Sequence, residues 1–158
     1  MLRLGRLTDY GIVLMAHLAS AGEGPRNARE LATETQLPLP AVSKLLKTLT
    51  REGLLTSSRG VKGGYQLAKR ASEIRVTQMI EALEGPIALT DCTLHEGACA
   101  QEARCHVRSP WQQINRAIHD ALSCISLADL AGNQGVSGFT PLANFAIGAD
   151  RDVSPGSS

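Results

Sequence analysis

Residues 27–68 contain two helical patterns, separated by a proline-containing turn and followed by a glycine-rich hairpin pattern. The first opens with Asn27-Ala-Arg-Glu30, a capping box whose side chains satisfy free amides at a helix start. Proline in QLPLPAV ends it, and a second helix is expected from about Pro40 to Gly53. Helix, turn, helix and hairpin in this order predict a winged helix-turn-helix.

The second of these helices has two contrasting faces. Its apolar positions form one stripe, which consists of Val42, Leu45, Leu46 and Leu49. Its opposite face is polar and basic and consists of Ser43, Lys44, Lys47, Thr48 and Arg51. A recognition helix presents such a face to the major groove of DNA, although a solvated surface helix can have the same pattern.

The hairpin pattern has basic residues at its turn. LLTSS and YQLAK have strand character, and RGVKGG between them permits a sharp reversal that exposes Arg59 and Lys62. A basic tip of this kind can reach phosphates or the minor groove, which favours a DNA-binding wing over an ordinary hairpin. Gly63 and Tyr65 complete the predicted DNA contacts.

The charge of the chain is divided between its two halves. Residues 1–75 carry twelve Lys and Arg against six Asp and Glu, a net charge of +6, whereas residues 76–158 carry four against nine, a net charge of −5. A basic first half favours a polyanionic partner for that half. We therefore expect residues 1–75 to bind double-stranded DNA.

Two shorter helices are expected on either side of these elements. Thr8 can cap a helix that begins with Asp9 and ends at the glycines of SAGEGP. VTQMIEAL, residues 76–83, predicts a helix closed by Gly85. Its expected buried residues are Met79, Ile80 and Leu83.

A long helix is expected over residues 109–125, where Ser109, Pro110 and Gln112 form a capping pattern. Its apolar stripe consists of Trp111, Ile114, Ile118, Ala121, Leu122 and Ile125. Such a stripe predicts a dimerisation helix, packing on its own domain, or both. SLADLA is expected to extend the helix by one turn, and residues 132–158, in which only FTPLANF is markedly apolar, are expected to form a flexible tail.

Residues 91–106 read DCTLHEGACAQEARCH and contain Cys92, Cys99 and Cys105, three of the four cysteines. The spacing lacks the Cys-x-x-Cys turn of zinc knuckles. Wide spacing suits a metal centre larger than a single ion, and thiolates are the favoured ligands of an iron-sulfur cluster. A fourth ligand is then needed, and the candidates are His95, His106, Cys124 and Asp9. Of these, Cys124 is expected to be a small buried hydrophobe.

Three features together resemble the winged-helix family of iron-sulfur cluster-sensing transcriptional regulators. They are the LTDY start of the first helix, the wing RGVKGGYQLA at residues 59–68, and the three-cysteine loop before a long helix. The resemblance covers about residues 1–131. Branches of this family include cluster biogenesis regulators (IscR-like) and nitric-oxide-sensitive repressors (NsrR-like), and the chain is most similar to the branch that controls a SUF-type assembly operon.

The resemblance implies a homodimer, a palindromic operator, and one 2Fe-2S or 4Fe-4S cluster per subunit held by Cys92, Cys99 and Cys105. Where one branch has a ligating histidine, this chain has Arg108, which cannot ligate. The Thr-Asp pair in the first helix matches the nitric-oxide-sensing branch. The resemblance therefore implies Asp9 as a fourth ligand to the cluster of the other subunit, with His106 as the alternative.

The expected fold is mainly α with a small β-hairpin wing. It comprises a winged helix-turn-helix over 1–75, a cluster-binding loop (91–106) and dimerisation helix (109–125) within 76–131, and the tail. The expected function is a repressor of iron-sulfur assembly genes. The alternatives are a nitric-oxide-sensing repressor or, from another class, an interaction module with structural zinc.

Two further classes are disfavoured. A thiol redox enzyme is not expected because the chain has no Cys-x-x-Cys motif. Without a signal-peptide pattern or an apolar run of membrane-spanning length, a cytoplasmic protein with no membrane partner is expected.

Overall fold

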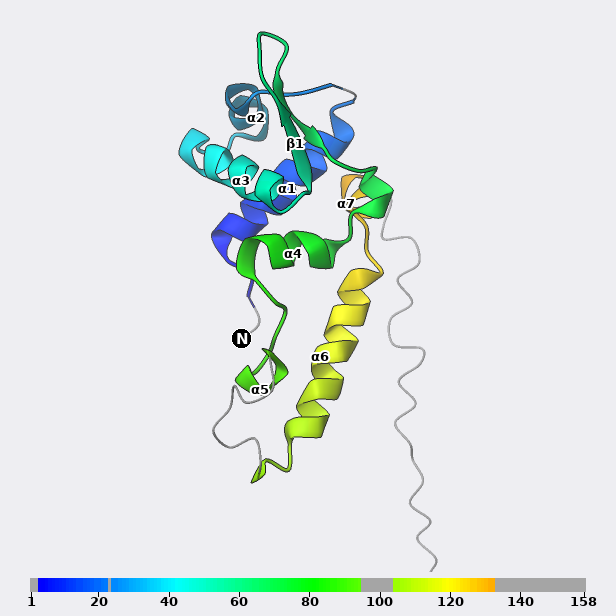
Figure 1. The fold of residues 1–158 in the computed structure, drawn as a ribbon. Coiled ribbons are helices and arrows are strands. Elements are labelled where there is room, and N and C mark those ends of the chain that lie inside the picture. Colours follow the sequence, from blue (N-terminus) through cyan, green and yellow to red (C-terminus); the bar gives the residue numbers. More distant parts are fainter. Residues whose placement is uncertain (1–2, 23, 95–103, 133–158) are drawn as a thin grey trace, which may run out of the picture.

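The computed structural model describes residues 3–22, 24–94 and 104–132, and every structural statement below concerns these residues. Its elements in chain order are α1 (Arg6–Ser20), α2 (Ala28–Thr35), α3 (Leu39–Arg51), β1 (Leu55–Ser58), β2 (Gly64–Leu67), the 3-10 helix η1 (Ala71–Glu73), α4 (Val76–Glu84), α5 (Asp91–Leu94), α6 (Arg108–Ser123) and α7 (Leu127–Ala131). Figure 1 shows α1 to α4, the hairpin and α7 gathered in one unit, from which α6 extends. The expected mainly helical class with a two-stranded hairpin is confirmed.

One hydrophobic core fills this unit. Its buried apolar residues are Leu14, Met15, Leu18, Leu31, Val42, Leu45, Leu46, Leu49, Leu54, Leu55, Ile74, Val76, Met79, Ile80 and Leu127. Burying a leucine side chain contributes about 1.5–3 kcal/mol, so the three leucines and one valine of α3 among them anchor that helix strongly. The core continues past residue 75 into α4 and α7.

The first helix begins earlier than the capping pattern indicated. α1 starts at Arg6 after Gly5, which makes no side-chain cap. Thr8 lies inside the helix and is 2% exposed, and its hydroxyl is hydrogen-bonded to Glu84 at the end of α4. The prediction of Thr8 as a cap was wrong, because its hydroxyl has a tertiary partner that local spacing does not reveal.

The helix-turn-helix follows the expected pattern. The Asn27 carboxamide oxygen accepts from the Glu30 backbone N–H at 3.0 Å, and the Glu30 carboxylate accepts from the Asn27 N–H at 3.0 Å. The turn places Gln36 in the left-handed region and Pro38 at the start of α3. All four predicted apolar residues of α3 are fully buried.

The hairpin is antiparallel and tightly closed. Leu55 pairs with Leu67, and Ser58 pairs with Gly64 at the turn end. A Cβ at Gly63 would lie 2.4 Å from the Ser58 carbonyl oxygen, so glycine is required there. The close approach of the chain on the two sides of the turn therefore depends on glycine at position 63.

The long helix differs from expectation at its start. α6 begins at Arg108 after Val107, and no side chain caps it, so the capping roles of Ser109 and Gln112 were wrong. The capping pattern therefore predicted the helix start one residue too late. Ser109 lies inside α6 and not at the cap position before it.

The end of the long helix also differs. Instead of extending α6, SLADLA forms α7, because the Leu127 N–H donates to the Ile74 carbonyl at 2.8 Å and the Val76 N–H donates to the Ile125 carbonyl at 3.0 Å. These bonds return the chain to the core. Cys124, expected to be buried, is exposed at the bend. Within the described ranges, no helix has the length and apolar character to cross a membrane.

Candidate nucleic-acid interface and cysteine site

The polar face of α3 is accessible. Lys44 and Lys47 are exposed, Ser43 and Thr48 are half-buried, and the buried stripe lies on the other side. Arg51 is exposed and donates to the Glu52 carboxylate at 3.0 Å, a surface pair of little energetic weight. The structure therefore brings the five residues predicted for this face to one side of α3.

The wing follows α3 directly. The Leu54 N–H donates to the Leu49 carbonyl at 2.9 Å, which ties the end of α3 to the start of β1. Arg59 and Lys62 are exposed at the hairpin turn. Within the described part of the chain, neither these cations nor Lys44 and Lys47 form ion pairs, so their charges remain available to phosphates.

Tyr65 has a different environment from the wing tip. Its backbone pairs with Arg26, with N···O distances of 2.9 and 2.8 Å, and its half-buried side chain packs against the core. Gly63 closes the turn through its backbone, as described above. Tyr65 pairs with Ser57, next to the turn end of the hairpin, but its side chain packs against the core instead of being exposed like the cations of the turn.

Sequence spacing did not reveal an ionic network that joins α1, α2 and the wing. Glu34 on α2 accepts from His17 of α1 at 2.7 Å and from Arg26 at 2.7 Å, while Arg26 also donates to the Ala21 carbonyl at 2.9 Å. The hydrogen bond with His17, and secondarily the charge of Arg26, hold the pKa of Glu34 below its ordinary value. These three residues lie on separate segments, so no local motif could have identified them.

Asp9 is exposed in the first turn of α1, beside a connection to α4. The Glu84 carboxylate accepts from the Thr8 hydroxyl and from the Gly5 N–H, and these two bonds, in that order, lower the pKa of Glu84. The turn that carries Asp9 is therefore fixed to the end of α4, from which the chain leads toward the cysteine run.

The described residues include parts of the cysteine run. The Cys92 backbone lies in α5, and Cys105 lies just before α6 with a half-buried thiol that forms no disulfide. His106 is exposed. Cys99 and His95 lie outside the described residues. Among the described residues, no three His, Cys, Asp or Glu side chains group as metal ligands.

A side chain of α6 holds the segment that leads into α5. The Asn115 carboxamide oxygen accepts from the Leu89 N–H at 3.0 Å, and its amide nitrogen donates to the Ile87 carbonyl at 3.1 Å. Asn115 shares a helix face with Ile118 and Leu122, since three and four residues make one turn. A polar residue on that apolar face was the signal in the sequence that could have identified it.

The two ends of the cysteine run are thus positioned by one helix. α5 contacts α6, and two residues separate Cys105 from the start of α6. Cys105 has a free, half-buried thiol, and the sequence of the run adds two further cysteines. Thiolates are the donors that a soft metal or an iron-sulfur cluster takes, so these residues fit such a group by their chemical type.

Comparison with known proteins gives a consistent result. A family model described as Rrf2, iron-dependent transcriptional regulator, matches residues 4–133. The chain is 31% identical over 130 residues to protein rrf2 of Nitratidesulfovibrio vulgaris, covering 82% of this chain and 87% of that protein. It is 34% identical over 136 residues to the HTH-type transcriptional regulator IscR of Photorhabdus laumondii, covering 85% and 82%.

Solved structures agree with these relatives. The structure of CymR, the global cysteine regulator of B. subtilis, matches with a TM-score of 0.66 and 31% identity, over 83% of this chain and 97% of that chain. The structure of T. potens IscR matches with a TM-score of 0.63 and 30% identity, over 82% and 85%. The arrangement of helices and hairpin is therefore shared with known regulators.

Proposed function

The chain belongs to the Rrf2 family of transcriptional regulators, and from this premise we propose that it represses genes of iron-sulfur cluster assembly according to the state of a bound cluster. As a family member it is a DNA-binding regulator and not an enzyme. We propose further that the repressed genes belong to a SUF-type operon and that the protein acts in the cytoplasm.

The observation that carries the proposal is the exposed basic face of α3 beside the wing. Lys44 and Lys47 lie on the helix that would enter the major groove, with Ser43, Thr48 and Arg51 around them. Arg59 and Lys62 would contact the backbone or the minor groove. In this proposal Tyr65 and Gly63 act by holding the wing in position.

A homodimer on a palindromic operator is part of the proposal. None of the residues of α6 is buried, and Trp111 and Ile114 are 38% and 41% exposed, which leaves an apolar stripe for a second copy. Two recognition helices would then meet half-sites about 34 Å apart, the length of one DNA turn.

The cysteine run would hold the cluster. Cys92, Cys99 and Cys105 would supply thiolates, and Asp9 of the other subunit, or else His106, would supply the fourth ligand. A cluster bound there, 2Fe-2S or 4Fe-4S, would supply redox and ligand-exchange chemistry that responds to oxygen, iron or nitric oxide. Nitric oxide as the signal is the second candidate, favoured by the exposure of Asp9 beside Thr8 at the start of α1.

The chain's own residues would transmit the state of the site. Thr8 and Gly5 fix the Asp9 turn to Glu84, and α1 also contacts α3. Movement of the Asp9 turn would therefore shift α1 relative to the recognition helix. Two recognition helices on fixed half-sites make DNA affinity sensitive to a small rotation.

The DNA-binding face is tested with Lys44→Ala combined with Lys47→Ala. We expect weaker binding to duplex DNA and a loss of about two units from the slope of log affinity against log salt, because two phosphate contacts disappear. Arg75→Ala with Arg116→Ala, which removes two exposed cations elsewhere, is the matched control. An unchanged slope in the first variant would contradict the proposed recognition helix.

The cluster is tested by purification without oxygen, followed by absorption spectroscopy and by iron, sulfide and zinc analysis. We expect a brown protein whose colour is lost in Cys105→Ser. Asp9→Ala should change the spectrum or shorten the cluster lifetime, with His106→Ala as its comparison. A colourless protein, with stoichiometric zinc or without metal, overturns the cluster proposal and leaves the DNA-binding proposal standing.

A further inference from the structure

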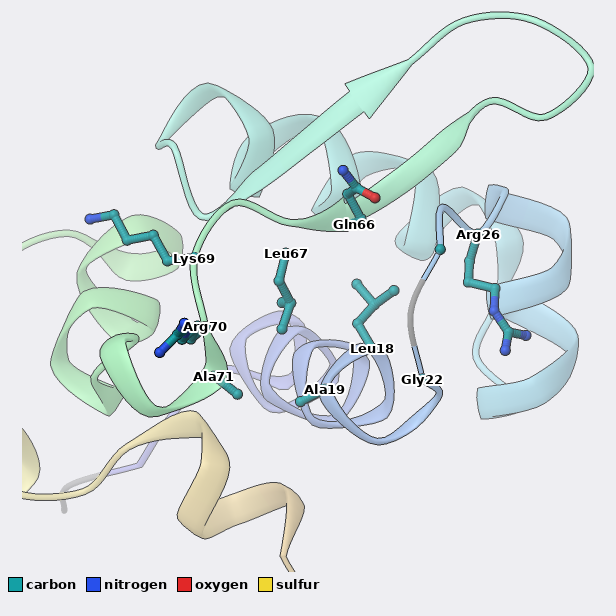
Figure 2. Close-up of a pocket in the computed structure, with 10 residues that line it drawn as sticks. Leu18, Ala19, Gly22, Arg26, Gln66, Leu67, Lys69, Arg70 and Ala71 are labelled. Carbon is teal, nitrogen blue, oxygen red and sulfur yellow. The ribbon is translucent and has the colours of Figure 1, made fainter.

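A cavity of about 770 Å³ lies at the base of the wing, away from the exposed face of α3 and from the cysteine run. The end of α1, strand β2 and η1 surround it. Its centre is apolar: Figure 2 shows Leu18 and Leu67 pointing toward one another, with Ala19 and Ala71 beside them. Nothing in the proposed function uses this cavity.

The cations of the cavity lie at its edges. Arg26 lies at one end and Lys69 and Arg70 at the other, and Figure 2 shows all three side chains directed away from the apolar centre. Arg26 is engaged by Glu34, whereas Lys69 and Arg70 are exposed and form no ion pair with any described residue. An apolar centre with a basic edge suits a peptide with apolar and then acidic side chains better than a compact anion.

The described chain ends beside this cavity. The Ser20 hydroxyl donates to the Ala131 carbonyl at 3.4 Å, and α7 packs against both α1 and η1, two of the cavity walls. Phe139 is seven residues beyond Gly132. A fully extended connection of this length spans up to about 25 Å, which allows Phe139 to reach the cavity. The segment that follows α7 is therefore close to the site and long enough to enter it.

That segment has the complementary chemistry. FTPLANF supplies Phe139, Leu142 and Phe145, and the acidic residues Asp150 and Asp152 follow, with Arg151 between them. We propose that residues 139–145 dock in the cavity of their own chain, with Asp150 and Asp152 facing Lys69 and Arg70. The docked segment braces the base of the wing, at β2, against the end of α1. This inference concerns a contact within one chain and does not depend on the cluster or the operator.

Amide hydrogen exchange on the full chain tests the contact. In the wild type, amides of residues 139–145 should exchange at least about tenfold more slowly than an unstructured peptide of the same sequence. Phe139→Ser with Phe145→Ser should abolish this protection and accelerate exchange in residues 64–71. Val153→Ser, which removes an apolar side chain outside the segment, is the matched control and should change neither. Peptide-like exchange of residues 139–145 in the wild type would overturn the proposal.

A photo-crosslinking amino acid in place of Phe139 identifies the occupant. We expect crosslinks within one chain to residues 18–22 or 66–71. Crosslinks between two chains would assign the cavity to the segment of a second copy, and crosslinks elsewhere, or none, would show that the segment does not dock. Each of these latter outcomes overturns the proposed contact.

Discussion

Helices α3 and α6 are both amphipathic, yet their apolar sides differ in how far they are buried. Val42, Leu45, Leu46 and Leu49 of α3 are fully buried within the chain, whereas α6 has no buried residue although it is longer. The same kind of sequence pattern therefore stabilises the fold in one helix and leaves a surface open in the other. The difference teaches that an apolar stripe predicts burial but does not tell which surface will cover it.

The largest effect should come from the buried side of this comparison. Leu45→Ala should lower the free energy of unfolding by about 2–5 kcal/mol, because it leaves a cavity among α1, α3 and α4. Chemical denaturation of the full chain measures the loss. Lys44→Ala, on the exposed side of the same helix, should change stability by no more than about 0.5 kcal/mol. Equal losses in both variants would contradict the burial of α3.

The exposed side is probed by Trp111→Ala with Ile114→Ala on α6. We expect the dimer dissociation constant, measured by sedimentation, to rise at least about tenfold, which corresponds to about 1.4 kcal/mol. Gln113→Ala, on the other side of α6, should leave it unchanged. If the double variant dimerises as the wild type does, α6 does not carry the interface.

A local effect is expected where α6 holds the segment that leads into α5. Asn115→Leu removes two hydrogen bonds to the backbone of residues 87–89, so the local opening free energy should fall by about 1–3 kcal/mol. Hydrogen exchange in residues 87–94 should accelerate while exchange in α3 stays constant. Gln112→Leu is the control on the same helix, and identical exchange in Asn115→Leu would show that the two bonds do not hold this segment.

The smallest effect concerns Glu84, which joins α1 to the end of α4. Its pKa in the folded protein lies below the ordinary value of 4.5, so its stabilising contribution is complete above that pH and is lost as pH falls through the lowered pKa. Because the carboxylate is exposed, we expect no more than about 0.5 kcal/mol after solvent screening. Thermal unfolding should show Glu84→Gln less stable than the wild type at pH 7, with the gap closing at low pH. A gap that stays constant with pH would exclude the carboxylate charge as its cause.

Local patterns predicted most of the structure of residues 1–75. The Asn27 capping box, the buried stripe of α3 and the glycine-rich hairpin all occur as expected, because each depends on contacts between residues near in sequence. Two of the errors arose where distant residues intervene. Thr8 bonds to Glu84 instead of capping α1, and Ile74 and Val76 draw Ile125 and Leu127 back into the core.

The candidate site was predictable to a lesser degree. Helical periodicity predicted the exposed cations of α3, because they lie opposite its buried stripe. The glycine-rich turn predicted the exposed cations of the wing tip. The bonds of Glu34 to His17 and Arg26 join separate segments and leave no local pattern, whereas Asn115 is marked only as a polar residue on an apolar helix face. The cysteine ligands remain a prediction, because Cys99 lies outside the described residues.

The paired bonds that join residues 74 and 76 to residues 127 and 125 have an evolutionary consequence. They bring the start of α4 and the end of the α6 region to adjacent positions, so the segment 76–125, which contributes α4 to the core, begins and ends at one place. Segments with adjacent ends tolerate insertion, shortening and replacement well, because changes between them do not displace the rest. A lineage with this architecture can therefore change the length and sequence of residues 85–124, the part of that segment beyond α4, and keep the unit that carries α3 and the hairpin.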